Sequence, residues 1–325
     1  QRQMCIRDRS HTAILAHSMN IPTVIGIGDE FLANIRPGEQ ALVDGFSGEV
    51  ILEPDAGILS KLTAPQEKST DTSEGTHTAD GTHVSIYSAD DPCAPLPEYV
   101  DGIAVFGCPL LSDETKQYEY YRAIAERTPD CRAIIRMPAI SPKDPDRQVK
   151  YYQQIRAVFR AASHGEPGIL FPMITSVPEA RKILAACDDA KMKLRAEGVK
   201  CSENVKIGFM VEIPAAAIIS DCLAPMADFF IIDSDSIARH TLACYEEDCF
   251  SPDFADGQLE AVMRLIGNSA RNAVKNGARI GICGSLAGDT SLTGDFLRMG
   301  IDNFCVTPDR LAEVRKRVTE VDLEV

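Results

Sequence analysis

Two groups of residues in this sequence are of types that could do chemistry. The first centres on His11, which stands between Ser10 and Thr12 at the start of the stretch SHTAILAHSMNIPTVIG. An imidazole nitrogen is a good nucleophile near neutral pH because its usual pKa is about 6.5. A helix start also favours a negatively charged product, through its free backbone N–H groups and its dipole. The plainer alternative for His11 is a polar residue near a helix cap.

The second group consists of polar residues that end short apolar runs elsewhere in the chain. Each of them alone is typical of an ordinary loop. An arginine, a glutamate and a cysteine at successive run ends are rarely needed for packing, so together they indicate a site. The members are Arg136, Thr175, Glu212, Asp233, Asp235, Cys283 and Ser285.

Eight short runs rich in β-branched residues must position this second group. They are residues 83–89, 102–107, 133–137, 168–174, 206–213, 229–235, 279–285 and 303–308. Helical patterns that end at glycine, such as residues 177–198 and 257–277, fill most of the gaps. Strand–helix alternation predicts a parallel sheet with crossovers.

The number of strand–helix units favours one α/β fold. Eight units match a (β/α)8 TIM barrel, which typically has about 250 residues, and an open doubly wound sheet is the alternative. Active sites of the barrel lie at the carboxyl ends of its strands. We therefore expect Arg136, Glu212, Asp235 and Cys283 to share one mouth of the barrel.

The chain before the barrel differs in composition. A predicted helix over residues 10–19, a strand over residues 22–27 and a hairpin over residues 41–54 make a small α/β domain, which we expect to be partial. Residues 64–82 are rich in Ser, Thr, Asp and Gly and predict a linker. The expected domains are therefore residues 1–63 and 83–325, joined by that linker.

Composition excludes several classes of protein. The formal net charge is −15, which disfavours nucleic acid as a partner because a phosphate backbone needs a basic face. No apolar run is long enough for a membrane span, and no secretory signal is visible. The 11 cysteines form no Cys-x-x-Cys pair, which argues against disulfides and zinc. We expect a cytoplasmic protein.

Four segments together resemble the phosphoenolpyruvate-utilising enzymes, and within them the enzyme I type of phosphoenolpyruvate–protein phosphotransferase. These segments are residues 10–26, ILFPMITSVPEAR at 169–181, GFMVEIPAAA at 208–217 and GICGSLAGD at 281–289. Thr12 favours the enzyme I type, since other members usually carry a small apolar residue there. The resemblance implies a swivelling phosphohistidine domain joined to a (β/α)8 barrel.

The resemblance also implies roles for individual residues. His11 matches the phosphorylated histidine, Arg136 a phosphate-clamping arginine and Cys283 the proton donor. Glu212 matches a ligand of Mg²⁺, and Asp235, or Asp233 as the alternative, could supply the second ligand. The implied partners are phosphoenolpyruvate and the phosphocarrier protein HPr, which serves sugar uptake. The resemblance further implies a homodimer.

The sequence departs from the family pattern at several positions around the expected site. Gly107 and Glu246 stand where the family has arginines, Ala139 and Ser285 where it has acidic residues, and Ser236 at the second metal ligand. Two alternatives to a working phosphotransferase therefore stay open. One is a catalytically impaired relative with a binding or regulatory role. The other is a lyase or aldolase with a metal at Glu212, which leaves the His11 motif unexplained.

Overall fold

The structure is a computed structural model that divides into two compact units, Gln1–Thr70 and Asp71–Val325. The described residues are 24, 31, 36, 39–44, 49–54, 75–89, 100–107, 111, 113–128, 132–139, 145–165, 167–202, 204–243 and 255–323.

The described part of the first unit is a two-stranded hairpin. Strands β1 (Ala41–Asp44) and β2 (Glu49–Leu52) pair antiparallel, with Ala41 opposite Leu52. This confirms the two strands of the predicted hairpin. The predicted helix over residues 10–19, which carries His11, lies outside the described residues. The predicted strand over residues 22–27 does so too, apart from Val24.

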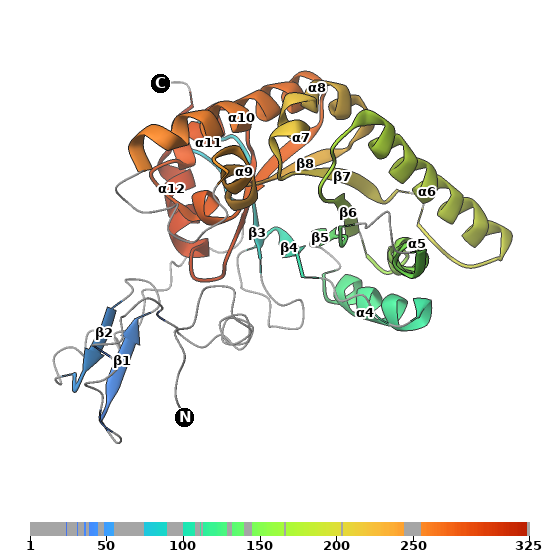
Figure 1. Cartoon of the computed structure of the whole chain (residues 1–325), viewed down its shortest axis with the longest axis horizontal. Helices are drawn as coiled ribbons and strands as arrows, with labels where there is room; N and C mark the ends of the chain where they lie inside the picture. Colours follow the sequence, from blue (N-terminus) through green and yellow to red (C-terminus); the bar gives the residue numbers. More distant parts are fainter. Residues whose placement is uncertain are drawn as a thin grey trace. The chain divides into compact units, whose positions relative to one another are not determined.

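Eight parallel strands form a closed barrel in the second unit (Figure 1). Each strand pairs with its neighbours in chain order, and β10 closes the ring against β3. The closed ring confirms the predicted (β/α)8 barrel and excludes the open sheet. The strands are β3 (Ser85–Ser88), β4 (Gly102–Val105), β5 (Arg132–Arg136), β6 (Pro167–Phe171), β7 (Lys206–Val211), β8 (Phe229–Asp233), β9 (Arg279–Cys283) and β10 (Asn303–Val306).

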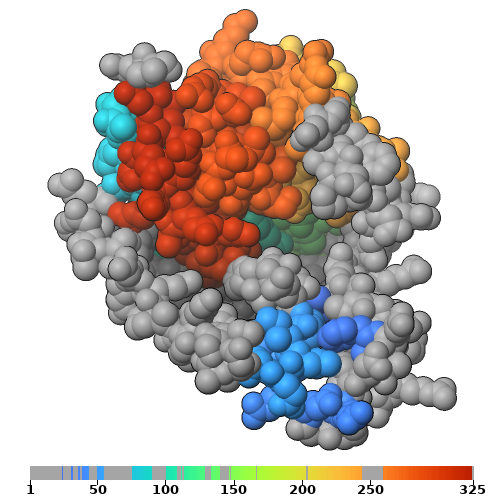
Figure 2. Space-filling view, turned by 90° about the vertical axis from the view of Figure 1, so that its left-hand side faces the viewer, coloured from blue at the N-terminus to red at the C-terminus, as the bar shows by residue number. Residues whose placement is uncertain are grey.

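Helices pack outside the strands and connect each strand from β4 to β10 to the next (Figure 1). Figure 2 shows the segment from α10 to α12, in orange and red, covering one side of this unit. The α-helices are α4 (Glu114–Arg127), α5 (Pro145–Ala161), α6 (Val177–Ala196), α7 (Pro214–Ile218), α8 (Ser220–Leu223), α9 (Ser234–Thr241), α10 (Ala255–Lys275), α11 (Thr293–Arg298) and α12 (Leu311–Glu320). The described residues also contain the 3-10 helices η1 (Ala224–Met226) and η4 (Ser285–Gly288).

Local sequence explains where the long helices begin and end. The Ser176 hydroxyl accepts a hydrogen bond from the backbone N–H of Glu179 at the start of α6, and the Glu179 side chain accepts from Thr175. Helices α6 and α10 end just before Gly198 and Gly277, whose φ angles are +70° and +72°. These glycines take the left-handed conformation that ends a helix at low steric cost, as the sequence predicts.

The core has an inner and an outer layer. One buried residue from each strand points into the barrel: Tyr87, Ala104, Ile134, Leu170, Met210, Ile231, Cys283 and Cys305. A larger apolar cluster lies between the strands and the helices. Phe229, at the start of β8, lies against Gly168 and Gly208, where side chains would overlap its ring. This packing fills the amino-terminal end of the barrel and leaves the opposite end for a site.

Part of the predicted linker packs on the barrel unit. His77 forms an isolated β-bridge with His83, and Thr76 and Thr78 are buried. The backbone N–H of Ala79 donates to the carbonyl of Val321, which ties this segment to the carboxyl end of the chain. Residues 64–74 lie outside the described part, so the linker stays a prediction there. Within the described ranges, no helix is both long and apolar enough to span a membrane.

Candidate active site

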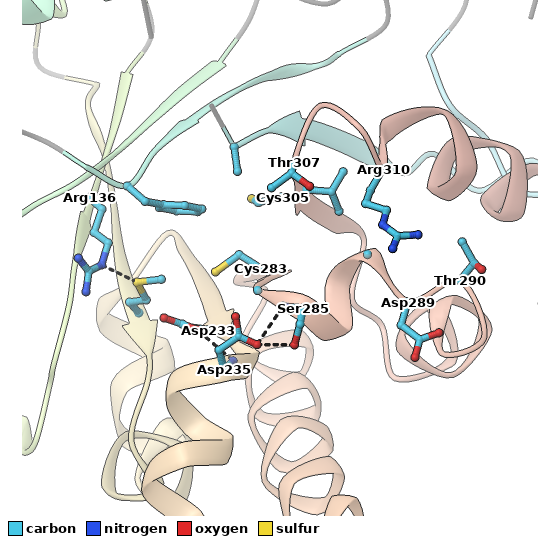
Figure 3. Close-up of a pocket in the computed structure, with 16 residues that line it drawn as sticks. Arg136, Asp233, Asp235, Cys283, Ser285, Asp289, Thr290, Cys305, Thr307 and Arg310 are labelled. Carbon is cyan, nitrogen blue, oxygen red and sulfur yellow. Dashed lines mark hydrogen bonds between the residues drawn. The ribbon is translucent and has the colours of Figure 1, made fainter. Parts of the chain in front are cut away.

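A cavity of about 850 Å³ opens at the carboxyl ends of the strands (Figure 3). Its walls come from the ends of β5, β8, β9 and β10 and from the loops that follow β9 and β10. The charged and polar residues that line it are Arg136, Asp233, Asp235, Cys283, Ser285, Asp289, Thr290, Cys305, Thr307 and Arg310.

Arg136 and Glu212 form a salt bridge beside this cavity. The Nη2 atom of Arg136 lies 2.6 Å from Oε1 of Glu212, and its Nε donates to the sulfur of Met210 at 3.1 Å. The other oxygen of Glu212 accepts from the backbone N–H of Met173 at 2.8 Å. The Glu212 side chain is 2% exposed and that of Arg136 27%. The arginine therefore neutralises a buried carboxylate and still reaches the cavity.

Asp233 holds the start of α9. Its Oδ1 accepts from the backbone N–H groups of Asp235 and Ser236, at 3.1 and 3.0 Å, and its Oδ2 accepts from the Ser236 hydroxyl at 2.7 Å. Both oxygens are thus engaged in capping the helix. Ser236, at the position where the resemblance implies a metal ligand, is part of the same cap.

Asp235 joins the loop after β8 to the loop after β9. Its Oδ1 accepts from both the backbone N–H and the hydroxyl of Ser285. The hydroxyl of the neighbouring Ser234 accepts from the backbone N–H of Leu286 at 3.2 Å. Between the loops, Gly284 has a φ of +90°, and a side chain there would overlap the Ser234 hydroxyl. A glycine at this position therefore lets the two loops approach closely.

Cys283 is a buried thiol at the cavity wall. It ends β9 and is 4% exposed. Burial raises the pKa of this thiol well above its usual value, and the charges of Asp233, Asp235 and Glu212 raise it further. At neutral pH Cys283 is therefore protonated, which suits a proton donor better than a nucleophile.

The structure brings most of the expected site residues to one mouth. Arg136, Asp235 and Cys283 line the cavity together with Asp233 and Ser285, and Glu212 lies behind Arg136. Thr175 does not line the cavity, because it bonds to Glu179 at the start of α6.

Some of the positions that depart from the family pattern lie in the described part of the chain and others do not. Gly107 and Ala139 are exposed and bring no charge to the site. Glu246 lies outside the described residues, as does His11.

Sequence reasoning missed Arg310, which lies across the cavity from Arg136 in Figure 3. It directly precedes α12, and its Nη1 lies 2.8 Å from Oε2 of Glu313. The Arg310 side chain is 44% exposed, so the second guanidinium of the cavity lies close to solvent. The segment TPDR follows the last strand at the same rim as the other site residues, and that position is the signal that could have found it.

The residues present fit a Mg²⁺ ion held by few protein ligands. Mg²⁺ is usually bound by one or two carboxylates, with water and substrate phosphate completing the shell. Among the described residues, no group of three His, Cys, Asp or Glu side chains could hold a metal. Glu212 and Asp235 are the candidate carboxylate ligands, and Oε1 of Glu212 would become available only when Arg136 turns away.

Family models identify the class of protein that this fold and site define. The model described as PEP-utilising enzyme, PEP-binding domain, matches residues 132–323, and the model of the PEP-utilising enzyme mobile domain matches residues 8–48. PEP stands for phosphoenolpyruvate. The chain therefore belongs to the PEP-utilising enzymes.

Within that family the chain is similar to proteins named phosphoenolpyruvate-protein phosphotransferase. It is 29% identical to the one from Priestia megaterium over 354 residues, and 28% identical to the one from Streptococcus equinus over 367 residues. Both alignments cover 96% of this chain and 62% of the relative. The chain thus spans less than two thirds of the length of these curated relatives.

Solved structures share the fold at low sequence identity. A Haloferax volcanii malate synthase in a magnesium/glyoxylate complex superposes with a TM-score of 0.52 at 12% identity, over 72% of this chain and 75% of the other. RipC from Yersinia pestis gives 0.50 at 12% identity, over 74% of this chain and 97% of the other. These likenesses support the barrel fold alone.

Proposed function

We propose that this chain is an enzyme I-type phosphotransferase, in which His11 takes a phosphoryl group from PEP and passes it to the carrier protein HPr. The observation that carries the proposal is the buried, protonated thiol of Cys283 at a cavity that Arg136 also lines. The family matches and the printed names of the relatives support the same reaction class.

PEP carries a phosphate and a carboxylate, and the cavity offers one arginine on each side. A guanidinium binds either anion through two parallel N–H bonds. Arg136 would leave Glu212 for the phosphate, and Arg310 would bind the other end of the substrate. Arg310 would then take over part of the work of the arginine that Gly107 replaces.

Glu212 and Asp235 would hold Mg²⁺, which when bound would neutralise charge on the phosphate oxygens. The exchange of partners at Glu212 makes substrate and metal binding interdependent, since Arg136 must move for either ligand to bind. We therefore expect Mg²⁺ to bind tightly only in the presence of PEP.

The reaction then needs one nucleophile and one acid. An imidazole nitrogen of His11 attacks the phosphorus, and the bond between phosphorus and the enol oxygen breaks. The resulting enolate takes a proton on its methylene carbon from the Cys283 thiol, which gives pyruvate. Water returns a proton to the thiolate. A raised thiol pKa serves this step, because the thiol keeps its proton until the enolate forms.

The domain organisation follows from the same proposal. Residues 1–63 would be part of the mobile phosphohistidine domain, residues 64–82 its linker and residues 83–325 the PEP-binding barrel. A mobile domain must carry His11 to the barrel mouth and then away to HPr. The proposal also includes a homodimer and a cytoplasmic location, which rest on the resemblance to the family.

Labelled phosphoryl transfer tests the proposal. The chain is incubated with Mg²⁺ and ³²P-labelled PEP, and protein-bound label is counted before and after mild acid. We expect acid-labile label that is absent in His11→Ala and unchanged in His17→Ala, a histidine of the same segment. No label in the unaltered chain, or equal label in His11→Ala, would overturn the proposal.

A second candidate is a catalytically impaired relative with a binding or regulatory role. The observation that favours it is the closed Arg136–Glu212 salt bridge, at a mouth where Gly107 and Ala139 add no charge. Calorimetric titration with PEP and Mg²⁺ separates the two candidates. Magnesium-dependent binding supports the enzyme, and binding of neither ligand supports the impaired relative.

A further inference from the structure

Two cysteines face each other on neighbouring strands inside the barrel. Cys283 of β9 and Cys305 of β10 are directly paired residues in the parallel ladder, and both belong to the inner layer. Neighbouring strands lie about 4.8 Å apart. A disulfide needs Cα atoms about 4.4–6.8 Å apart and side chains that point the same way. The register thus places the two Cα atoms within the separation that a disulfide needs.

Both thiols line the cavity. Cys283 is 4% exposed and Cys305 1%, and both are among the cavity-lining side chains of Figure 3. The Cys305 sulfur has one weak polar contact, 3.6 Å from Oδ1 of Asn303. Both cysteines therefore border the cavity that opens at the barrel mouth.

Other described cysteines lack this arrangement. Cys187 is buried on α6 away from the cavity, and burial raises the pKa of its thiol to about 12. Cys201 and Cys222 are more exposed and do not line the cavity. A reagent that enters the mouth therefore meets Cys283 and Cys305 and no other described cysteine.

We propose that Cys283 and Cys305 form a dithiol site that small disulfides oxidise to an intramolecular disulfide. Burial raises the pKa of both thiols, so the reaction needs loss of a thiol proton to water and is faster at alkaline pH. The resulting thiolate attacks the small disulfide RSSR, which forms a mixed disulfide and releases RS⁻, and RS⁻ takes up a proton to give RSH. The second thiol then attacks the mixed disulfide, which closes the Cys283–Cys305 bond and releases a second RSH. Two thiol hydrogens leave the protein, and the small disulfide is reduced to two thiols. The second step is favoured because the attacking thiol is held one strand away.

The consequence for activity depends on the proposed function. A disulfide removes the S–H proton of Cys283, so the enolate loses its acid. General acids contribute about 10²-fold or more to such steps. We therefore expect oxidation to lower the rate of pyruvate formation by about that factor, and a reducing dithiol to restore it.

Tryptic peptides provide a direct test of the bond. The chain is treated with hydroxyethyl disulfide, denatured in acid with an alkylating reagent, and digested with trypsin. Cleavage after Arg279, Arg298 and Arg310 places the two cysteines in separate peptides, residues 280–298 and 299–310, each with a single cysteine. We expect a linked pair of these peptides that separates on reduction. Two separately modified peptides, or a link from Cys283 to another cysteine, would overturn the proposal.

Matched variants make the test specific. Cys305→Ser removes one thiol with little change in volume, so the linked peptide should disappear, and any oxidised Cys283 should be recovered as a mixed disulfide with the reagent. Cys187→Ser should leave the linked peptide in place. A linked peptide in a chain that never transfers phosphate would overturn the proposed function and leave the dithiol site standing. A linked peptide with undiminished phosphoryl transfer would overturn the consequence for activity.

Discussion

At the scale of single residues, the contact between Arg136 and Glu212 governs both stability and binding. Glu212 is almost fully buried, so removing its partner leaves a carboxylate without a cation in the barrel wall. Such a loss typically costs about 3–5 kcal/mol. Because Arg136 is partly exposed to solvent, we expect the lower end of that range.

A double-mutant cycle tests this contact. Arg136→Met should lower the free energy of unfolding by about 3 kcal/mol, and adding Glu212→Gln should restore most of it by removing the unpaired charge. Neither variant should bind PEP. Urea denaturation measures the stabilities, and calorimetry measures the binding. Equal destabilisation in the single and double variants would contradict the claim that the unpaired Glu212 carboxylate is what lowers stability.

Arg310 is predicted to act on the substrate rather than on the fold. Its partner Glu313 lies on the exposed side of α12, so Arg310→Ala should change stability little. A charge-assisted hydrogen bond is worth about 1.5–3 kcal/mol, which is roughly a tenfold to hundredfold loss of affinity for PEP. Arg298→Ala on α11 is the control, since Arg298 has an exposed acidic partner and does not line the cavity. Similar affinities for the two variants would remove Arg310 from the site.

At the scale of elements, the site depends on two loops that are joined at Gly284. The loop after β8 and the loop after β9 meet through Ser234, Asp235 and Ser285. These contacts position Asp235 beside Cys283 at the cavity wall.

Replacing Gly284 separates backbone strain from steric overlap. Gly284→Ala combines a φ of +90° with an overlap against Ser234, whereas Gly198→Ala has a φ of +70° and open space around the new methyl group. The left-handed conformation alone costs an L-residue about 1–2 kcal/mol, so Gly198→Ala should lose about that much. Gly284→Ala should lose clearly more and should also weaken PEP binding. Thermal unfolding and calorimetry check this, and equal losses in both variants would contradict the close approach of the loops.

Element boundaries show what local sequence can and cannot predict. The eight apolar runs predicted the eight strands, since each run buries its residues on both sides of the barrel wall. The runs at 206–213 and 229–235 extend past the ends of β7 and β8 at Val211 and Asp233. Strand pairing ends there because the chain turns into α7 and α9, and apolar character does not mark that point.

At the scale of the whole molecule, the closed barrel brings together residues that are remote in sequence. Arg136 and Glu212 are 76 positions apart: Arg136 ends β5 and Glu212 directly follows β7, and these two strands are not neighbours in the barrel. The sequence predicts both residues at the same mouth, because each of them ends one of the apolar runs that predict the strands. It could not predict their salt bridge or the reach of Arg310, since side-chain contacts depend on the geometry of the closed ring.

Alkaline pH should weaken the fold through its buried thiols. The pKa of Cys187 rises from 9.0 to about 12 in the folded chain, so the folded state holds this proton more tightly than the unfolded state. The contribution of this thiol to the free energy of unfolding is complete below pH 9 and is lost as the pH rises toward 12. The expected slope is about 1.4 kcal/mol per pH unit for this group. Urea denaturation between pH 9 and 11 should show a shallower slope in Cys187→Ala, and an unchanged slope would contradict the burial of this thiol.

The most direct test of the central claim is a single-turnover experiment with PEP, in which pyruvate and acid-labile label on His11 are measured in the same quenched samples. The account predicts equal amounts of pyruvate and phosphohistidine. It also predicts that pyruvate formation is about 10²-fold slower in Cys283→Ala, while the affinity for PEP is unchanged. Label on His11 and pyruvate at the full rate in Cys283→Ala would contradict the assignment of the acid. Pyruvate without label on His11 would contradict the phosphoryl transfer itself.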